Sequence, residues 1–305
     1  MSAKLITADN VEPIRLDRFL KRLFPGLTQG VIEKALRKKK IRINRRRAES
    51  SSRIVMNDEI IINTEFFIAY CPPDENKEFS QSAISLAEKL LSNYLIQSTN
   101  DYIAINKPYG LAVQGGSKIN LSIDDALDYL NYSNKTEYKL VHRLDKETSG
   151  ILIVANGYEN AAKIGKAFRD RSIKKTYVAV LSGTLRLKQG VISNYIAKKN
   201  DGTYELVRED GNGKKADTAY KILSSRNNLS LVEFQPATGR THQLRVHSLI
   251  LGYPIVGDKK YGSAPYSRML LHAKELILPK TVFGSEIKII TDLPRCFDLN
   301  DVKIY

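Results

Sequence analysis

The first quarter of the chain carries two short helical patterns followed by strand-like segments. The apolar face of the first pattern consists of Leu16, Phe19, Leu20 and Leu23. Pro25-Gly26 interrupts this pattern, and Thr28 is suited to cap the second one. The second apolar face consists of Val31, Ile32, Ala35 and Leu36. Strand-like pieces follow at 41–43, 53–55 and 59–62, so we expect a small α/β domain over 14–72, preceded by a short arm at 1–13.

A polar segment separates this domain from the rest of the chain. The run Pro72-Pro73-Asp74-Glu75-Asn76 has the composition of a linker. A helical pattern follows at 82–91, and we expect this helix to pack on the next domain. We therefore place the boundary near residue 75 and assign 73–95 to a linker and a connecting helix.

Short strand patterns dominate the remaining part of the chain. They lie at 102–106, 174–181, 218–223, 229–234, 270–278 and 285–290. Helical patterns lie at 124–130, at 160–168 and from about residue 241 onward. Because strands follow one another directly and helices are interspersed irregularly, the pattern predicts an α+β domain over 96–305 with a mixed, largely antiparallel sheet.

Composition narrows the class of protein. Hydrophobic residues make up 42% and charged residues 27% of the 305 residues, which is typical of a globular protein in water. No run approaches the ~18 apolar residues of a membrane span, and the N-terminus lacks the apolar core of a secretory signal. Two distant cysteines, Cys71 and Cys296, do not indicate a disulfide framework or a zinc site. We expect a cytoplasmic protein without membrane association.

The net charge of +15 is concentrated in one segment. Between residues 15 and 53 there are 14 lysines and arginines and only 3 acids, a balance of +11. A solvated helix face is the usual explanation of a charge run, but such a face interleaves acids with its cations. An unbalanced basic surface needs an anionic partner such as a nucleic acid. The candidate contacts are Lys38, Lys39, Lys40, Arg42, Arg45, Arg46 and Arg47.

The two helical patterns followed by Lys-Lys-Lys-Ile-Arg-Ile-Asn resemble an S4 RNA-binding domain over residues 14–63. Where S4 domains often carry Asn-Gly-Lys in a turn, this chain has Asn44-Arg45-Arg46-Arg47. The change adds charge and removes a glycine. It leaves the turn geometry open, while the affinity for RNA should not suffer.

A dense group of charged residues precedes the apolar run at 151–154. Within the stretch 140–154 the chain reads His-Arg-Leu-Asp, then Lys-Glu, then Thr-Ser-Gly. An arbitrary charge cluster is most often a solvated loop. This wording, however, resembles the active-site motif of the RluA-type pseudouridine synthases. In that family the aspartate, here Asp145, is the catalytic residue.

Further motifs of the same family occur in order along the chain. Asn106-Lys107-Pro108-Tyr109-Gly110 and Ala112-Val113-Gln114-Gly115-Gly116 resemble the first family motif, and Gly257-Asp258-Lys259-Lys260-Tyr261-Gly262 resembles the last. Each motif alone is weak, but the ordered set is specific. We interpret these loops as scaffold, with Lys107 near an RNA phosphate.

The resemblance also assigns roles to individual residues. It supplies an arginine that keeps Asp145 ionised, and we assign this ion pair to Arg240 in Thr238-Gly239-Arg240-Thr241-His242-Gln243-Leu244-Arg245. Tyr177 stacks on an extruded uracil, and Arg143 contacts RNA and assists base flipping. His142 is interpreted as structural. His242 and His247 are five residues apart without a neighbouring glutamate, so we expect no metal site.

The resemblance implies the isomerisation of specific uridines to pseudouridine, which needs no cofactor. Attack of Asp145 on the sugar, attack on the base and proton abstraction from the sugar all require an ionised carboxylate, and the three routes stay open. The combination with an S4 domain is most similar to the RluC-type enzymes, which act on 23S ribosomal RNA of the large subunit. RluD-type or transfer-RNA enzymes, and a non-catalytic S4-type RNA-binding protein, are the alternatives. We expect a monomer whose partner is ribosomal RNA, free or in assembling subunits.

Overall fold

The computed structural model describes residues 3–7, 13–24, 27–63, 66, 78–116, 119–200, 205–262 and 266–302. The chain forms two compact units, residues 1–78 and 79–305. The linker expected at 72–76 and the helix breaker Pro25-Gly26 lie outside the described residues.

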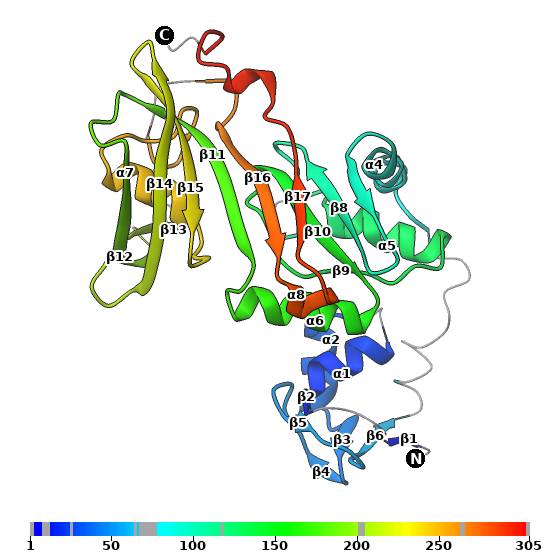
Figure 1. Cartoon of the computed structure of the whole chain (residues 1–305). Coiled ribbons are helices and arrows are strands. Elements are labelled where there is room, and N and C mark those ends of the chain that lie inside the picture. The colour runs from blue at the N-terminus through cyan, green and yellow to red at the C-terminus, as the bar shows by residue number, and fades with distance from the viewer. Residues whose placement is uncertain are drawn as a thin grey trace. The chain divides into compact units, whose positions relative to one another are not determined.

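The first unit combines two helices with small antiparallel sheets (Figure 1). Its helices are α1 (Leu16–Leu23) and α2 (Gln29–Arg37). One sheet has the order β1-β6-β3-β4, comprising β1 (Ala3–Thr7), β6 (Glu59–Asn63), β3 (Ile41–Ile43) and β4 (Arg46–Arg47), and β2 (Ile14–Arg15) pairs with β5 (Arg53–Ile54). Leu16, Leu20 and Ile32 are fully buried in the core, and Thr28 caps α2 by accepting a hydrogen bond from the Val31 amide.

The arm expected at residues 1–13 is partly a strand. Residues 3–7 form β1, which pairs with β6 in antiparallel register from Ala3 opposite Asn63 to Thr7 opposite Glu59. The prediction missed this strand because its position depends on a partner more than fifty residues away.

The turn that departs from the S4 pattern is a two-residue hairpin turn. Asn44 and Arg45 have φ of 48° and 64°, which is the left-handed pair of a type I′ turn. The Asn44 side chain supports it, since its amide donates to Asp58 Oδ1 at 2.7 Å and its oxygen accepts from the Glu59 amide at 2.8 Å. These contacts stabilise the turn without the usual glycine.

The second unit is built on an 11-stranded mixed sheet (Figure 1). The strand order is β13-β12-β14-β15-β11-β16-β10-β8-β7, with β17 beside β16 and β9 beside β10. Between the described strands, β10 and β16 form the one parallel pair. The strands are β7 (Leu95–Ser98), β8 (Tyr102–Lys107), β9 (Tyr138–Leu140), β10 (Ser149–Asn156), β11 (Lys174–Ser182), β12 (Gln189–Asn200), β13 (Glu205–Glu209), β14 (Lys214–Arg226), β15 (Leu229–Pro236), β16 (Leu271–Leu278) and β17 (Ile287–Ile290). The α+β class with a largely antiparallel sheet is confirmed.

Helices cover both faces of this sheet. They are α4 (Gln81–Ser92), α5 (Ile123–Ser133), α6 (Tyr158–Arg169), α7 (Gln243–Ile250) and α8 (Lys280–Phe283), with a 3₁₀ turn η1 (Arg295–Phe297). The helix expected at 82–91 is α4, and it packs on α5 and β7 as expected. No helix in the described part of the chain is long and apolar enough to cross a membrane.

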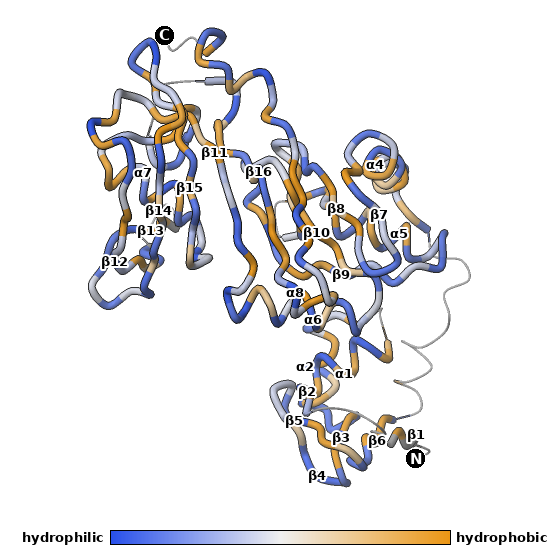
Figure 2. Tube along the Cα trace, viewed as in Figure 1, coloured by the Kyte–Doolittle hydropathy of each residue, from blue (hydrophilic) through white to orange (hydrophobic). Residues whose placement is uncertain are grey.

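Strand alternation explains how the two layers of helices are held. In β8, Ile103 and Ile105 pack with α4 and α5, whereas Tyr102 and Ala104 pack with α6 and α8. β10 repeats this alternation from residue 151 to 155. Both strands are therefore apolar along most of their length, as Figure 2 shows. They form a rigid base for the loop that precedes β10.

Candidate active site

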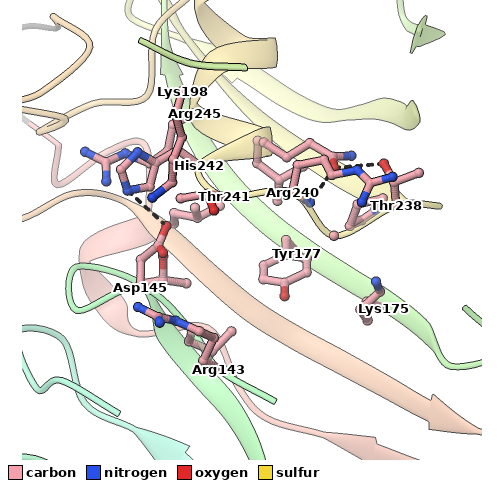
Figure 3. Close-up of a pocket in the computed structure, with 17 residues that line it drawn as sticks. Arg143, Asp145, Lys175, Tyr177, Lys198, Thr238, Arg240, Thr241, His242 and Arg245 are labelled. Atoms are coloured by element: carbon pink, nitrogen blue, oxygen red, sulfur yellow. Dashed lines mark hydrogen bonds and ion pairs between the residues drawn. The ribbon is translucent and has the colours of Figure 1, made fainter. Parts of the chain in front are cut away.

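A cavity of about 290 Å³ opens in the second unit where the loop before β10 faces β11 and the start of α7 (Figure 3). Asp145 and Arg143 from the loop before β10 line it together with Tyr177 from β11. The remaining lining residues are Leu144, Thr148, Lys175, Lys198, Pro236, Thr238, Gly239, Arg240, Thr241, His242, Gln243, Leu244, Arg245 and Leu271. The three residues that the sequence motifs assigned to the uridine are thus brought together.

The loop that carries Asp145 is anchored on both sides. Buried Leu144 fixes it to the core formed with α4 and α5, and the Thr148 amide donates to the Asp145 carbonyl at 3.0 Å. Gly150 explains the glycine of the Thr-Ser-Gly motif. Its φ is +108°, and a Cβ there would lie 2.3 Å from the Ala273 carbonyl oxygen of β16. A side chain would separate the only parallel pair of described strands, five residues after Asp145 in the chain.

Lys107, which we expected near an RNA phosphate, is buried in the structure. Its side chain has no exposed surface, and Nζ donates to the carbonyls of Pro108, Leu111 and Lys146 at 3.0, 2.8 and 3.2 Å. Burial lowers the pKa of Lys107 to about 7, although the charge of Asp145 opposes this shift. Lys107 therefore connects the turn after β8 to the loop of Asp145 and belongs to the scaffold.

The ion pair expected between Arg240 and Asp145 is absent from the described contacts. The Arg240 Nε donates instead to the Lys215 carbonyl at 3.0 Å, which directs the guanidinium along β14. The described contact of the Asp145 carboxylate is instead with His242, whose Nε2 lies 3.9 Å from Asp145 Oδ2. Arg240 lines the cavity, but it is not the arginine of the charge network beside Asp145.

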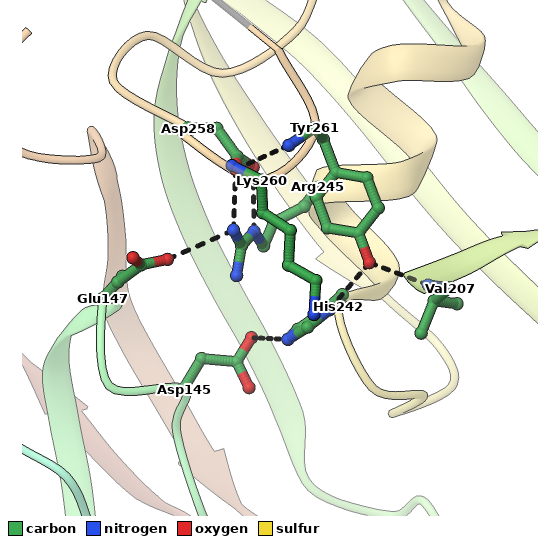
Figure 4. A network of polar contacts seen from close by, with 8 residues as sticks. All are labelled: Asp145, Glu147, Val207, His242, Arg245, Asp258, Lys260 and Tyr261. Atoms are coloured by element: carbon green, nitrogen blue, oxygen red, sulfur yellow. Dashed lines mark hydrogen bonds and ion pairs between the residues drawn. The ribbon is translucent and has the colours of Figure 1, made fainter. Parts of the chain in front are cut away.

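That arginine is Arg245, on the first turn of α7 (Figure 4). It is 3% exposed and forms a bidentate pair with Asp258, which is 1% exposed, at 2.8 and 2.6 Å. Its Nη2 also lies 3.1 Å from Glu147 Oε2, two residues after Asp145. Burial opposes the charge of the guanidinium, but the bonds to Asp258 more than offset this and raise the pKa of Arg245. Arg245 thereby joins the loop of Asp145 and Glu147 to the motif at residues 257–262, which contains Asp258.

The network is completed by Tyr261 and His242. Tyr261 Oη lies 2.7 Å from His242 Nδ1 and accepts a hydrogen bond from the Val207 amide at 3.0 Å. Asp258 accepts from the Tyr261 amide at 3.1 Å and so fixes the tyrosine beside the arginine. His242 itself has a left-handed backbone with φ of 53°, a conformation that is uncommon outside glycine and is often found at functional sites. Sequence reasoning assigned none of these roles to His242, Arg245, Asp258 or Tyr261.

Gln243 holds the segment that forms one wall of the cavity. It is buried, and its Oε1 accepts hydrogen bonds from Thr238 Oγ1 at 2.8 Å and from the Arg240 amide at 2.9 Å. Its Nε2 donates to the Asp217 carbonyl and to Thr218 Oγ1 on β14, at 3.0 and 2.9 Å. One end of the Gln243 side chain therefore binds the run from Thr238 to Arg240, and the other end binds β14 of the sheet.

Tyr177 lies at an irregularity of β11. The register against β16 shifts between Thr176 and Tyr177, and Tyr177 faces the cavity together with Lys175. Burial, reinforced by the charge of Asp145, raises the pKa of Tyr177, so its phenol stays protonated at neutral pH. Arg143 is exposed at the same opening. This arrangement offers an aromatic ring and an exposed cation to a base that enters the cavity.

His142 has a structural environment. Its Nε2 accepts a hydrogen bond from the Ile153 amide at 2.9 Å, and its ring stacks on Phe168 with centroids 4.4 Å apart. Burial lowers its pKa to about 3, so the ring is neutral. Among the residues that the structure describes, no group of three or more His, Cys, Asp or Glu side chains could hold a metal ion.

The basic residues of the first unit surround the end of α2 and the β3–β4 turn. Lys38, Lys39, Arg42, Arg45, Arg46 and Arg47 are exposed and Lys40 is half-buried. Glu59 and Asp58 lie beside the turn, but neither forms an ion pair with these cations in the described structure. The positive charges of these side chains are therefore available to bind an anionic polymer.

Comparison with known proteins identifies the family. Residues 101–249 match the model for RNA pseudouridylate synthases, and residues 14–60 match the S4 domain. The chain is 49% identical to the ribosomal large subunit pseudouridine synthase C of Rickettsia bellii (strain RML369-C), over 96% of this chain and 99% of that protein.

Solved structures give the same result. The chain is similar to the human RNA pseudouridylate synthase domain containing 4, with a TM-score of 0.61 and 32% identity over 71% of this chain and 94% of that one. It is also similar to the human RNA pseudouridylate synthase domain containing 1, with a TM-score of 0.58 and 28% identity over 68% and 86% of the two chains. The protein therefore belongs to the RNA pseudouridylate synthase family and combines its catalytic domain with an N-terminal S4 domain.

Proposed function

We propose that the protein converts specific uridines of large-subunit ribosomal RNA to pseudouridine, with Asp145 as the catalytic carboxylate. The observation that carries this proposal is the single cavity that holds Asp145, Tyr177 and Arg143. The relatives at about half identity support the substrate class, since they are named for the large ribosomal subunit. We place the activity in the cytoplasm, in a monomer that acts on free ribosomal RNA or on assembling subunits.

The reaction rearranges atoms within one nucleotide. The bond from N1 to the sugar C1′ breaks, the base turns, and C5 bonds to the same carbon. C5 then loses its proton, while N1 ends with one. Asp145 is half-buried at the cavity wall, with His242 Nε2 3.9 Å from its Oδ2, so its carboxyl group can reach a nucleotide in the cavity by any of the three routes. Tyr177 provides a ring of the kind that stacks on extruded bases, a contact worth about 1–3 kcal/mol.

The substrate class is tested with purified protein and three transcripts labelled with tritium at C5 of uridine. Joining C5 to the sugar releases this tritium. We expect release from large-subunit ribosomal RNA and none above background from small-subunit ribosomal RNA or transfer RNA. Release from transfer RNA alone would overturn the substrate assignment, and binding without release from any transcript would favour a non-catalytic RNA-binding protein.

The exposed cations of the first unit are expected to bind the RNA backbone. Each neutralised phosphate contributes ~0.7–0.9 to the slope of log affinity against log salt concentration. Replacing Lys38, Arg46 and Arg47 with glutamine in the full-length protein should therefore reduce this slope by about 2–3. The three cations are exposed, and Arg46 and Arg47 lie outside the left-handed positions of the turn.

The matched control replaces Lys188, Lys221 and Lys280 with glutamine. These lysines are exposed on the second unit and do not line the cavity. We expect the control to change the slope by less than about 1. Filter-binding titrations at several salt concentrations measure both values, and equal slopes for the two triple variants would contradict the assignment.

A further inference from the structure

A chain of polar contacts leads from β13 to Asp145 (Figure 4). The Val207 amide donates to Tyr261 Oη at 3.0 Å, and this oxygen lies 2.7 Å from His242 Nδ1. The other ring nitrogen, Nε2, lies 3.9 Å from Asp145 Oδ2. The position of each hydrogen along this chain decides what His242 presents to the carboxylate.

The contacts of Tyr261 place the first hydrogen. Tyr261 is buried, and its Oη already accepts from an amide, which can only donate. Among the described residues, His242 Nδ1 is its other partner. If Nδ1 carried a hydrogen, Oη would accept twice and its own hydrogen would lack an acceptor, which is costly in a buried site. The favoured arrangement has Oη donating to an unprotonated Nδ1.

The surroundings of His242 place the second hydrogen. The ring is neutral, because burial lowers the pKa of His242 to about 4, although Asp145 opposes this shift. Arg245 and Lys260 also disfavour the charged ring, while Asp258 favours it. A neutral imidazole carries one hydrogen, and with Nδ1 unprotonated this hydrogen is on Nε2. That is also the nitrogen that faces a carboxylate oxygen, where a lone pair would be repelled.

We propose that Tyr261 fixes His242 in its Nε2–H form and that His242 is a positioning residue, which presents this hydrogen to one oxygen of Asp145. The inference rests on the proposed function, in which Asp145 is the catalytic carboxylate. At 3.9 Å the contact is longer than a hydrogen bond, as is common in active sites without substrate, and it tightens when a uridine fills the cavity. One carboxylate oxygen is then held and the other is left to act on the nucleotide.

The residues around Tyr261 are arranged to keep it in place. Asp258 accepts from its backbone amide, and the Arg245 guanidinium carbon lies 5.0 Å from the centre of its ring. The amide of Val207 adds a contact from the β12–β13 hairpin. The buried pair of Arg245 and Asp258 thus supports the orientation of His242 as well as the loop of Glu147.

Nitrogen NMR of the full-length wild-type protein tests the tautomer directly. The chain has only four histidines, so ¹⁵N-histidine labelling gives a simple spectrum, and the His242→Gln spectrum identifies the signal of His242. We expect Nε2 to carry the hydrogen and Nδ1 to show the shift of an unprotonated nitrogen from pH 6 to 8. A hydrogen on Nδ1, or a charged ring at pH 7, would overturn the proposal. This readout needs no RNA, so it is independent of whether the proposed function is right.

Single-turnover kinetics test the consequence for Asp145. Tyr261→Phe should lower the rate of pseudouridine formation by about 10-fold or more with RNA affinity within about twofold, and should leave a mixture of His242 tautomers in the spectrum. His242→Gln keeps an N–H donor and should retain more activity than His242→Met, by about 10-fold. Tyr253→Phe is the control, because this tyrosine lies outside the cavity and its hydroxyl has no described hydrogen bond. A wild-type rate for Tyr261→Phe, or equal rates for the two His242 variants, would overturn the positioning role.

Discussion

Replacing Asp145 with asparagine is expected to reduce the single-turnover rate of pseudouridine formation by about 10⁴-fold or more, with little change in RNA affinity. Asparagine has the shape of aspartate, but it cannot serve as an anionic nucleophile or base. The Asp145 side chain is half-buried and its one described side-chain contact is the long one to His242, so the fold should persist. The measurement is pseudouridine formed against time with enzyme in excess.

The matched control is Asp170→Asn. Asp170 caps α6 in the same unit, is exposed and does not line the cavity, so the variant should keep the wild-type rate. If Asp145→Asn retained more than about a tenth of the rate, the catalytic assignment of Asp145 would be wrong.

The second large effect concerns Arg245 and separates it from Arg240. Arg245→Met removes the guanidinium that neutralises buried Asp258, and breaking such a pair costs about 3–5 kcal/mol of unfolding free energy. Arg240→Met removes one hydrogen bond to the Lys215 carbonyl and should cost about 1 kcal/mol. We also expect the Arg245 variant to lose most activity, because Glu147 and the loop of Asp145 lose their anchor on α7.

Urea denaturation measures both stabilities. The double variant Arg245→Met with Asp258→Leu should regain part of the loss, since it leaves no uncompensated charge of this pair in the interior, although the Lys260 and Tyr261 amides lose Asp258 as acceptor. Equal losses for Arg240→Met and Arg245→Met, or no recovery in the double variant, would contradict the network in Figure 4.

The motifs in the sequence anticipated much of the site. Asp145 and Arg143 were assigned from one short motif and Tyr177 from a segment about thirty residues later, and the structure places all three around one cavity. Their proximity could be expected, because the family resemblance assigned all three residues to one site. Their catalytic and RNA-binding roles remain predictions.

The choice between two arginines could not be made from the motif alone. Arg240 and Arg245 lie in one short run, and the difference between them is that α7 begins at Gln243. Arg245 is therefore on a helix whose residues 243–248 are all buried, whereas Arg240 precedes the helix. Arg245 stands between Leu244 and Val246 at the start of this helix. This placement indicates a buried arginine, which is expected to pair with a carboxylate.

The burial of Lys107 was not predicted from the sequence either. It continues the alternation of Ile103 and Ile105 in β8, and both isoleucines face the core with α4 and α5. The period of the strand thus indicated a buried lysine, while the family motif drew attention to the loop. Three nearby carbonyls satisfy the ammonium group, and no sequence pattern reveals such carbonyls.

The β12–β13 hairpin was not predicted at all. In β12, buried Ile192 and Ile196 alternate with Val191 and Tyr195, which are exposed, so apolar residues occupy both faces. The period-two signal is then lost. This hairpin supplies Lys198 to the cavity and the Val207 amide to Tyr261, so its omission also hid part of the site.

The most direct measurement is a map of pseudouridines, at single-nucleotide resolution, in RNA from cells that lack the gene and carry either the wild-type or the Asp145→Asn protein. We predict a set of uridines in large-subunit ribosomal RNA that is modified with the wild-type protein and unmodified with the variant, at equal protein levels. The same uridines modified in both strains, or wild-type-dependent sites confined to transfer RNA, would contradict the account.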